Sequence, residues 1–390
     1  MDATAAARSL RGADPAAGGA PEIRLEGVSK VYPDGTVGVA ELDLTFAAGE
    51  LSVLVGPSGC GKTTTMKMVN RIIEPTTGRI LLGGEDVTRV DADRLRRRIG
   101  YVIQSVGLFP HQTVRATVAT VPRLLGWDRR EISDRVEELL TLVGLDPAVH
   151  GDRYPVQLSG GQRQRAGVAR ALAADPGVLL MDEPFSAVDP VVRERLQSEF
   201  LRLQEAVRKT IVFVTHDIEE AVRLGDRIAV MSAGGHVEQF APPPELLGRP
   251  ANRTVADFVG GDRGLKRLAV TPIEPADLEH PPVVGTTDGL AEAGAALARA
   301  GAGWAVVLDG GGRPAGWLPA DRAAGAGTVA SALARPDGAV PVQASLRTAL
   351  ASILQTDAGW VPVLDGGRYV GVLTPSSVHT TLRRSINGPR

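Results

Sequence analysis

The chain has 390 residues, which at ~150 residues per domain predicts two or three domains. Its 43 Lys and Arg residues are nearly balanced by 45 Asp and Glu residues, and the net charge of -2 excludes a protein built mainly to hold nucleic acid. The hydrophobic fraction of 43% excludes a disordered chain. Its single cysteine, Cys60, cannot form a disulfide within the chain, which indicates a reducing compartment.

The first twenty residues combine Ala and Gly with scattered charges and contain no continuous apolar stretch. We expect residues 1–20 to form a flexible tail and not a signal peptide. No apolar run in the sequence approaches the ~20 residues that span a bilayer. The sequence therefore predicts a soluble protein, and such a protein can still work at a membrane surface.

Short apolar runs alternate with amphipathic stretches in the first two thirds of the chain. The runs end in polar or glycine residues, which is the pattern of buried and largely parallel strands. The stretches at 131–143 and 191–207 predict helices between them, so we expect an α/β domain over residues 21–262. Residues 258–264 (FVGGDRG) are expected to form a linker. The predicted strands cover residues 51–56, 98–104, 178–182, 210–217 and 227–231.

Residues 56–63 read GPSGCGKT, which is the phosphate-binding pattern G-x-x-x-x-G-K-[ST] between a strand and a helical stretch. Glycine lets backbone N–H groups curl around phosphate oxygens, and the N-terminus of the next helix adds its positive end. We expect Lys62 to reach the β- and γ-phosphates and the Thr63 hydroxyl to bind Mg²⁺. The predicted ATP-binding residues of this loop are Gly56, Pro57, Ser58, Gly59, Cys60, Gly61, Lys62, Thr63 and Thr64.

A second apolar run, VLLMDEP at 178–184, places two acidic residues at the end of a buried strand. We expect Asp182 to hold Mg²⁺ through its water shell and Glu183 to be the general base that polarises the attacking water. Without the phosphate motif upstream, a helix-capping role for this acidic pair is the better interpretation. Together the two motifs predict an ATPase that works with ATP and Mg²⁺.

The last third of the chain contains an internal repeat. Residues 303–309 read GWAVVLD and residues 359–365 read GWVPVLD, 56 residues apart. The match extends backward to helical stretches that open at Leu290 and Leu346, and forward through glycine turns to a second strand in each copy. One copy is too short to bury a core of its own, so the sequence predicts two packed repeats. They cover residues 268–390, at about 268–329 and 330–390.

Residues 158–162 read LSGGQ and lie between the phosphate motif and Asp182. This order of motifs resembles the ATPase of ABC transporters, over approximately residues 21–260. A Ser and two glycines at a helix start form a second phosphate-binding N-terminus. In the family this motif closes over the γ-phosphate held by the other subunit, so the resemblance implies a dimer, expected here to be a homodimer. The contacts to ATP implied for this motif are Ser159, Gly160, Gly161 and Gln162.

Four further residues match the family position by position. Tyr32 matches the aromatic residue that stacks on adenine, and Gln104 matches the glutamine that contacts Mg²⁺ and the attacking water. His216 matches the γ-phosphate sensor, so the resemblance implies catalytic roles for Gln104, Glu183 and His216. Asp189 ends the segment SAVD, which matches the loop that couples the two ATP sites. The alternatives are an ordinary tyrosine at a strand end and a structural histidine.

The chain carries one ATPase unit, so it resembles a bacterial importer subunit that docks on separate membrane permease proteins. Residues 61–80 and 101–114 are similar to the subgroup that imports quaternary-amine osmoprotectants, namely glycine betaine, carnitine, choline and proline betaine. The resemblance implies a peripheral protein on the cytoplasmic face of the inner membrane, served by a separate extracytoplasmic substrate-binding protein.

The tryptophans bear on whether this chain itself contacts such a substrate. Recognition of a quaternary ammonium group usually requires an aromatic cage. No tryptophan lies near another aromatic residue in the sequence, so we expect the chain not to contact the substrate. The four are Trp127, Trp304, Trp317 and Trp360.

The repeat in the tail is similar to a pair of CBS modules, an appendage typical of this subgroup, and the resemblance implies a regulatory region. Three roles stay open: sensing of ionic strength, binding of a regulatory nucleotide such as a cyclic dinucleotide, and dimerisation alone. CBS modules that bind adenosine ligands often place an Asp six residues after the glycine of the last strand. Arg322 and Ser377 stand at these positions, which puts ribose recognition by such an Asp in doubt.

Two other functions stay open at this level. An importer ATPase for another small solute, such as an amino acid, shares the ATPase motifs. A soluble ABC-type ATPase that acts on DNA or ribosomes is disfavoured, because such proteins usually carry two ATPase units or a long coiled-coil insertion. The sequence thus predicts an α/β P-loop ATPase with a mainly parallel sheet and a helical subdomain, followed by a small α/β tandem CBS region.

Overall fold

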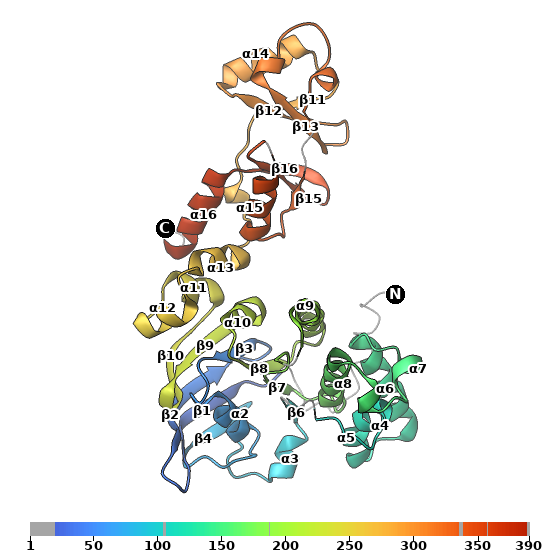
Figure 1. Ribbon diagram of the computed structural model, residues 1–390, viewed down its shortest axis with the longest axis vertical. Coiled ribbons are helices and arrows are strands. Elements are labelled where there is room, and N and C mark those ends of the chain that lie inside the picture. The colour runs from blue at the N-terminus through green and yellow to red at the C-terminus, as the bar shows by residue number, and fades with distance from the viewer. Residues whose placement is uncertain (1–19, 104–106, 187, 335–337, 357, 388–390) are drawn as a thin grey trace. The chain divides into compact units, whose positions relative to one another are not determined.

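The computed structural model describes residues 20–103, 107–186, 188–334, 338–356 and 358–387, so the predicted tail lies outside it except for Ala20. The chain divides into two compact units (Figure 1). One unit contains the chain up to Leu246 together with Pro250–Phe258, and the other contains Leu247–Arg249 and Val259–Arg390. Each unit has hydrophobic core clusters of its own.

A six-stranded sheet with the order β10-β9-β3-β8-β7-β6 forms the centre of the first unit. Four neighbouring pairs in it are parallel, whereas β10 runs antiparallel to β9. Every residue of β3, β7 and β8 is buried, which explains why these strands read as continuous apolar runs. The strands are β3 (Leu51–Val55), β6 (Ile99–Val102), β7 (Val178–Asp182), β8 (Thr210–Thr215), β9 (Arg227–Ser232) and β10 (His236–Ala241).

A second, antiparallel sheet with the order β2-β1-β4-β5 belongs to the same unit. The strands of this sheet were not predicted from the sequence, because polar residues interrupt their apolar positions. Strand β2, for example, alternates between buried and exposed side chains over much of its length. Phe46 of this sheet and Leu54 of β3 belong to one core cluster. Its strands are β1 (Ile23–Val31), β2 (Val37–Phe46), β4 (Thr77–Leu82) and β5 (Glu85–Asp86).

The helices of the first unit include the predicted pair, observed as α6 and α9, and Figure 1 shows α4 to α7 grouped beside α8 as a helical subdomain. Within the described part of the chain, no helix is both long enough and apolar enough to cross a membrane. The helices from α2 to α12 are α2 (Lys62–Val69), α3 (Ala92–Arg96), α4 (Val114–Val118), α5 (Thr120–Leu124), α6 (Arg129–Leu142), α7 (Pro147–His150), α8 (Gly160–Leu172), α9 (Pro190–Val207), α10 (Ile218–Leu224), α11 (Pro243–Gly248) and α12 (Arg253–Val259).

The second unit contains the two repeats, each built as a short strand, a helix and two further strands. In both sheets the first strand pairs in parallel with the second, and the second pairs antiparallel with the third. The first repeat holds β11 (Val283–Gly285), α14 (Leu290–Ala300), β12 (Trp304–Leu308) and β13 (Pro314–Pro319). The second holds β14 (Val340–Pro341), α15 (Leu346–Gln355), β15 (Val361–Asp365) and β16 (Arg368–Leu373), and α13 (Arg263–Val270) and α16 (Pro375–Asn387) flank the pair.

Three tryptophans, two from the first repeat and one from the second, meet between the two repeats. Trp304 and Trp360 occupy equivalent positions in the repeats, and their rings stack with centroids 4.3 Å apart and planes 10° from parallel. Trp317 meets Trp360 edge to face at 6.5 Å. The fold therefore gathers aromatic residues that the sequence pattern leaves scattered, and Trp360, which is 4% exposed, lies at the centre of this cluster.

The predicted linker at 258–264 is wrong at both of its ends. Helix α12 extends to Val259, and α13 begins at Arg263. Leu268 of α13 is buried in the core cluster of the second repeat. Arg267 is also buried, and it donates hydrogen bonds to the carbonyl oxygen of Leu382 and to Oγ of Ser385. This packing makes α13 part of the second unit, whereas its glycines and charges alone are typical of a loop.

Candidate functional site

The loop between β3 and α2 contains the predicted phosphate motif. Lys62 is 6% exposed, and its Nζ donates to the carbonyl oxygens of Gly56 at 2.7 Å and Pro57 at 2.9 Å. Gly61 caps α2 with φ of 104°, and a Cβ atom there would lie 2.7 Å from the carbonyl oxygen of Gly38. The loop thus joins a helix N-terminus to a buried cation whose partners are neutral carbonyl groups and the Cys60 sulfur, and this combination suits a phosphate.

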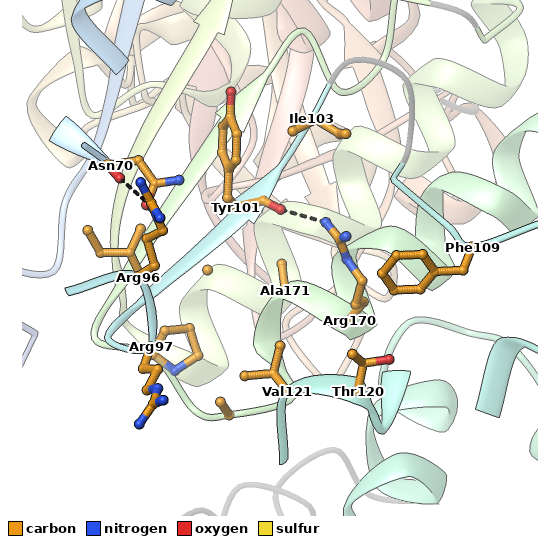
Figure 2. A pocket seen from close by; sticks show the side chains of 14 residues that line it. Asn70, Arg96, Arg97, Tyr101, Ile103, Phe109, Thr120, Val121, Arg170 and Ala171 are labelled. Atoms are coloured by element: carbon orange, nitrogen blue, oxygen red, sulfur yellow. Dashed lines mark hydrogen bonds between the residues drawn. The ribbon is translucent and has the colours of Figure 1, made fainter. Parts of the chain in front are cut away.

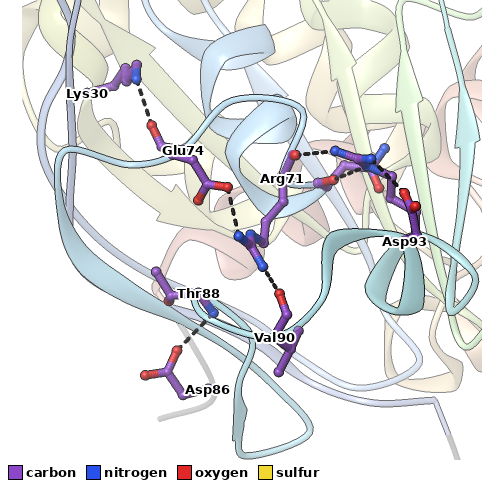
Figure 3. A network of polar contacts seen from close by, with 9 residues as sticks. Lys30, Arg71, Glu74, Asp86, Thr88, Val90 and Asp93 are labelled. Carbon is purple, nitrogen blue, oxygen red and sulfur yellow. Dashed lines mark hydrogen bonds and ion pairs between the residues drawn. The ribbon is translucent and has the colours of Figure 1, made fainter.

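A polar network holds the other end of α2 (Figure 3). Arg71 follows the helix and pairs with Glu74 at 2.8 Å, while its other amino group donates to the carbonyl oxygen of Val90. Lys30 of β1 donates to the carbonyl oxygen of Glu74 at 2.7 Å, and Arg96 of α3 donates to that of Arg71 at 2.6 Å. These contacts tie α2 to the antiparallel sheet and to α3, and they fix the direction in which its N-terminus points.

Thr63 and Asp182 meet at the carboxyl edge of the parallel sheet, where Thr63 Oγ1 donates to Asp182 Oδ1 at 3.1 Å. Burial raises the pKa of the Asp182 carboxyl, and the hydrogen bond from Thr63 opposes this rise. A hydroxyl and a carboxylate fit Mg²⁺, which takes few protein oxygens and fills its other positions with water and phosphates. Among the described residues, no group of three or more His, Cys, Asp or Glu side chains is placed to hold a metal ion.

Glu183 and His216 face each other beside this pair. His216 Nδ1 lies 3.3 Å from Glu183 Oε1, and the histidine side chain is 59% exposed. Glu183 has a left-handed backbone with φ of 44°, and its N–H donates to the carbonyl oxygen of Val214 in β8 at 3.0 Å. Such a conformation costs ~1–3 kcal/mol in a residue other than glycine. The structure therefore fixes the backbone of Glu183 directly after Asp182, and its carboxylate lies beside His216.

The LSGGQ motif forms the start of α8. The Ser159 hydroxyl accepts from the Gln162 backbone N–H at 3.2 Å, and Gln162 Oε1 accepts from the Ser159 N–H at 2.9 Å, which is a capping box. Gln162 Nε2 also lies 3.3 Å from His150 Nε2, a contact that the spacing of the histidines did not suggest. Among the described residues, no hydrogen bond or ion pair joins residues 159–162 to the phosphate loop, so one chain brings together only part of the predicted set.

The remaining predicted residues lie at separate points around the loop. Tyr32 directly follows β1, and its hydroxyl is 3.4 Å from Oγ1 of Thr64. Asp189 caps α9, where its side chain accepts from the backbone N–H of Val192 at 3.1 Å. Gln104 lies outside the described residues, so its place in the site stays a prediction.

A small cavity of about 40 Å³ lies behind Glu183 and His216, and its lining includes two residues that the sequence motifs did not single out. Arg193 of α9 donates to the carbonyl oxygen of Val188 at 3.0 Å. Glu220 of α10 accepts from Gln197 Nε2 at 3.0 Å, and burial raises the pKa of its carboxyl. The sequence offers a slight signal for Arg193, because residues 193 and 197 are four apart and share one face of the predicted helix, and it offers none for Glu220.

A larger pocket of about 260 Å³ opens between the strand β6 and the helices α5 and α8 (Figure 2). Its lining is mostly apolar, with arginine side chains among it. Arg170 of α8 donates to the carbonyl oxygen of Tyr101 in β6, as the dashed line in Figure 2 marks. The lining residues are Asn70, Arg96, Arg97, Ile99, Gly100, Tyr101, Ile103, Phe109, Thr120, Val121, Arg170, Ala171, Ala174 and Pro176.

Comparison with known proteins places these residues in context. Residues 39–186 match the model of the family described as ABC transporter. The osmoprotectant import ATP-binding protein OsmV of Salmonella typhimurium is 42% identical, over 94% of this chain and 98% of that protein. The glycine betaine/carnitine/choline transport ATP-binding protein OpuCA of Bacillus subtilis is 53% identical, over 62% of this chain and 63% of that protein.

A solved structure shows the same fold for the first unit. It is a dimeric structure of the ATP-binding cassette MJ0796 in a post-hydrolysis state, bound to ADP and Pi. Its sequence is 33% identical, and the match covers 56% of this chain and 98% of that chain with a TM-score of 0.51.

Proposed function

Because this chain belongs to the ATP-binding subunits of ABC transporters, in the group of osmoprotectant import systems, we propose that it drives the uptake of quaternary-amine osmoprotectants. Glycine betaine, carnitine and choline are the expected substrates. The chain is an ATP hydrolase, and hydrolysis is the step that it couples to import. The observation that supports the substrate class best is that the similarity to the Salmonella osmoprotectant protein runs through both units.

The nucleotide is proposed to bind at the loop of residues 56–63, with its base against Tyr32. The buried ammonium of Lys62 and the N-terminus of α2 attract the phosphates, and Thr64 lies within reach of Tyr32. Mg²⁺ would be held by Thr63 and Asp182, with Gln104 as a further ligand, and would screen the charge of the β- and γ-phosphates. The hydrogen bond between Thr63 and Asp182 supports this, because it brings the two oxygen ligands together.

Glu183 is the proposed general base. Its carboxylate takes a proton from a water molecule while the water oxygen bonds to the γ-phosphorus, and the bond from that phosphorus to the β–γ bridging oxygen breaks. ADP and phosphate are the products. His216 lies within contact distance of Glu183, so it is placed to hold the γ-phosphate and to orient the base.

The complete site is proposed to need a second copy of the chain. Residues 159–162 form a capped helix start that is suited to a phosphate, yet their described hydrogen bonds stay within α8 or reach His150. In a homodimer this motif would close over the γ-phosphate that the other copy holds in its phosphate loop. Asp189, at the start of α9, would then lie in the loop that couples the two sites.

Membrane permease subunits are the proposed partners, which would place the chain at the cytoplasmic face of the inner membrane. The 260 Å³ pocket beside β6 is the surface that we assign to the permease, because it combines apolar side chains with arginines and Arg97 is exposed. A separate extracytoplasmic binding protein would select the substrate. The aromatic cluster of the second unit does not change this, since two of its rings stack 4.3 Å apart and leave no room for an ammonium group between them.

The second unit is proposed to regulate the ATPase as a tandem CBS region. Its two repeats pack through Trp304 and Trp360, as expected for a region that works as a pair. A change in ionic strength and a regulatory nucleotide are the two signals to test. If neither signal alters the rate of ATP hydrolysis by the full chain, the role left for the second unit is dimerisation alone.

Uptake assays test the proposal. A strain that lacks the gene should lose uptake of radiolabelled glycine betaine or choline, and the wild-type chain should restore it. Glu183→Gln should bind ATP but fail to restore uptake, because the amide cannot accept the proton. Uptake of an amino acid in place of betaine would change the substrate, and rapid hydrolysis by Glu183→Gln would overturn the assignment of the base.

A further inference from the structure

His150, the last residue of α7, contacts the LSGGQ motif at the start of α8. Its Nε2 lies 3.3 Å from Nε2 of Gln162, and its Nδ1 lies 3.1 Å from the carbonyl oxygen of Asp146. Gln162 is the residue that closes the capping box with Ser159. The histidine therefore belongs to the polar contacts that hold the motif, although no step of the proposed ATP chemistry uses it.

The backbone groups at the two ends of this row of contacts fix every donor and acceptor in it. A carbonyl oxygen can only accept, so His150 Nδ1 carries the hydrogen that it donates to Asp146. Gln162 Oε1 accepts from the Ser159 N–H at 2.9 Å, so the Gln162 amide nitrogen faces His150 as a donor. His150 Nε2 must then accept, and the ring must be neutral, because a neutral imidazole has one donor and one acceptor nitrogen.

A second proton on the His150 ring would oppose this arrangement. It would place an N–H group on Nε2 opposite the N–H of the Gln162 amide, and two donors repel each other. The amide cannot turn over to present its oxygen, because that oxygen accepts from Ser159 in the capping box. A positive ring would also lie beside the N-terminus of α8, whose macrodipole favours negative charge. Protonation of His150 therefore weakens the start of the LSGGQ helix.

The charged groups around α7 are engaged with other partners. Arg115 lies 3.3 Å from Glu137 and 3.7 Å from Asp152, and the Asp146 carboxylate accepts from a backbone N–H of α7. In the part of the chain that the structure describes, no ion pair includes His150, so no carboxylate holds a proton on its ring. The charged side chains on the surrounding elements are Asp146, Asp152 and Arg153 next to α7, Arg115 of α4, Glu137 of α6 and Arg163 of α8.

We propose that His150 is a positioning residue of the LSGGQ motif, which in its neutral form holds Gln162 and with it the phosphate-binding start of α8. Both ends of the Gln162 amide are engaged within the chain, and the N–H groups of residues 160 and 161 have no partner inside the helix, so they are left for a phosphate. This inference rests on the proposed function, in which the motif closes over the ATP of the other copy. Histidine ordinarily changes its charge between about pH 5 and pH 8, so acid should weaken this closure.

Glutamine and asparagine at position 150 provide a matched pair of variants. The glutamine amide reaches the place of Nε2 and keeps an acceptor that never becomes charged, whereas the asparagine amide reaches only the place of Nδ1. The full chain with Glu183→Gln, which should bind ATP without consuming it, is tested for ATP-dependent dimerisation by analytical ultracentrifugation. At about pH 8, His150→Asn should raise the dimer dissociation constant roughly 3- to 10-fold, and His150→Gln should leave it within about twofold. The Kd for ADP, measured by calorimetry, should stay within about twofold in both variants, because the phosphate loop is untouched.

A change of pH separates positioning from general destabilisation. Between about pH 8 and about pH 6, the dimer dissociation constant should rise at least ~3-fold more for the chain with His150 than for His150→Gln, because only the imidazole gains a charge. His280→Gln, which replaces an exposed histidine of the second unit, should keep the pH dependence of the parent chain. Equal pH dependence of the parent chain and His150→Gln, or equal weakening by glutamine and asparagine, would overturn the inference. If the Glu183→Gln chain does not dimerise with ATP at either pH, the proposed function fails and the inference fails with it.

Discussion

Replacing Trp360 tests how the two repeats of the second unit hold together. The side chain is 4% exposed, stacks on Trp304 at 4.3 Å and meets the edge of Trp317. Its Nε1 is buried and has no hydrogen-bond partner among the described residues. Trp360→Ala and Trp360→Phe therefore remove different things: alanine removes the ring contacts together with the N–H group, whereas phenylalanine keeps one ring and removes the unpaired donor.

The two substitutions should differ by several kcal/mol in the free energy of unfolding. Truncation of a buried aromatic side chain to alanine costs ~3–5 kcal/mol. Phenylalanine loses part of the stacking, which is worth ~0.5–1.5 kcal/mol, but it also relieves a buried donor whose desolvation costs ~1–3 kcal/mol. We therefore expect Trp360→Phe to change the stability by no more than about 1 kcal/mol in either direction.

Differential scanning calorimetry of the full chain provides the measurement. The two units have separate cores, so each should give its own transition. Trp360→Ala should lower the transition of the second unit by roughly 10–20 °C, and Trp127→Ala, in the first unit, should leave that transition unchanged. Equal losses for alanine and phenylalanine would refute the reasoning about the unpaired donor. A loss below about 1 kcal/mol for alanine would refute the role of the stacked pair.

Three further predictions concern the first unit. Lys62→Ala should weaken ATP binding by roughly 10- to 100-fold, because a charged hydrogen-bond donor is worth ~1.5–3 kcal/mol, and unchanged affinity in calorimetry would argue against the phosphate loop. Glu183→Gln should lower kcat by ~100- to 10,000-fold in a phosphate-release assay without weakening ATP binding. Burial raises the pKa of Glu220, so the carboxyl group keeps its proton in the folded protein at pH values where the unfolded chain releases it. The free energy of unfolding of the wild type therefore falls as the pH rises from the pKa of Glu220 in the unfolded chain to its pKa in the folded protein. Glu220→Gln cannot titrate, so its stability relative to the wild type, measured by urea unfolding, should increase across that window; a constant difference between pH 4 and pH 8 would count against the raised pKa.

The parallel sheet and the phosphate loop were predictable because both leave local signals. A strand buried on two faces must be apolar throughout, and a loop that wraps phosphate needs glycines and a lysine at fixed spacing. Predicted and observed bounds agree for β7, and β3 differs by one residue at its end. The pairing of Thr63 with Asp182 follows from these two signals, since parallel strands place their carboxyl ends at one edge of the sheet.

The contacts that depend on distant segments left no such signal. Arg170 looks like any other arginine of an arginine-rich chain, and its two carbonyl partners are 63 and 69 residues away in the sequence. Trp304 and Trp360 meet only because the repeats pack against each other. The predicted linker lies at the boundary between the two units but is too long, because the packing of Arg267 and Leu268 decides whether residues 263–270 are helical, and composition reports only the local preference.

One chain brings together some parts of the proposed site but not others, and the arrangement of the strands explains this difference. Asp182 ends β7, the phosphate loop follows β3 and His216 follows β8, which lies between those two strands. Backbone hydrogen bonds of a single sheet therefore fix these three points relative to one another. Residues 159–162 belong to α8, a helix that packs beside the edge strand β6, where Arg170 donates to the carbonyl oxygen of Tyr101. The phosphate loop, Asp182 and His216 are thus assembled by one sheet, whereas residues 159–162 begin a helix outside it and make no described hydrogen bond to the phosphate loop, which is why a second chain is needed to complete the proposed site.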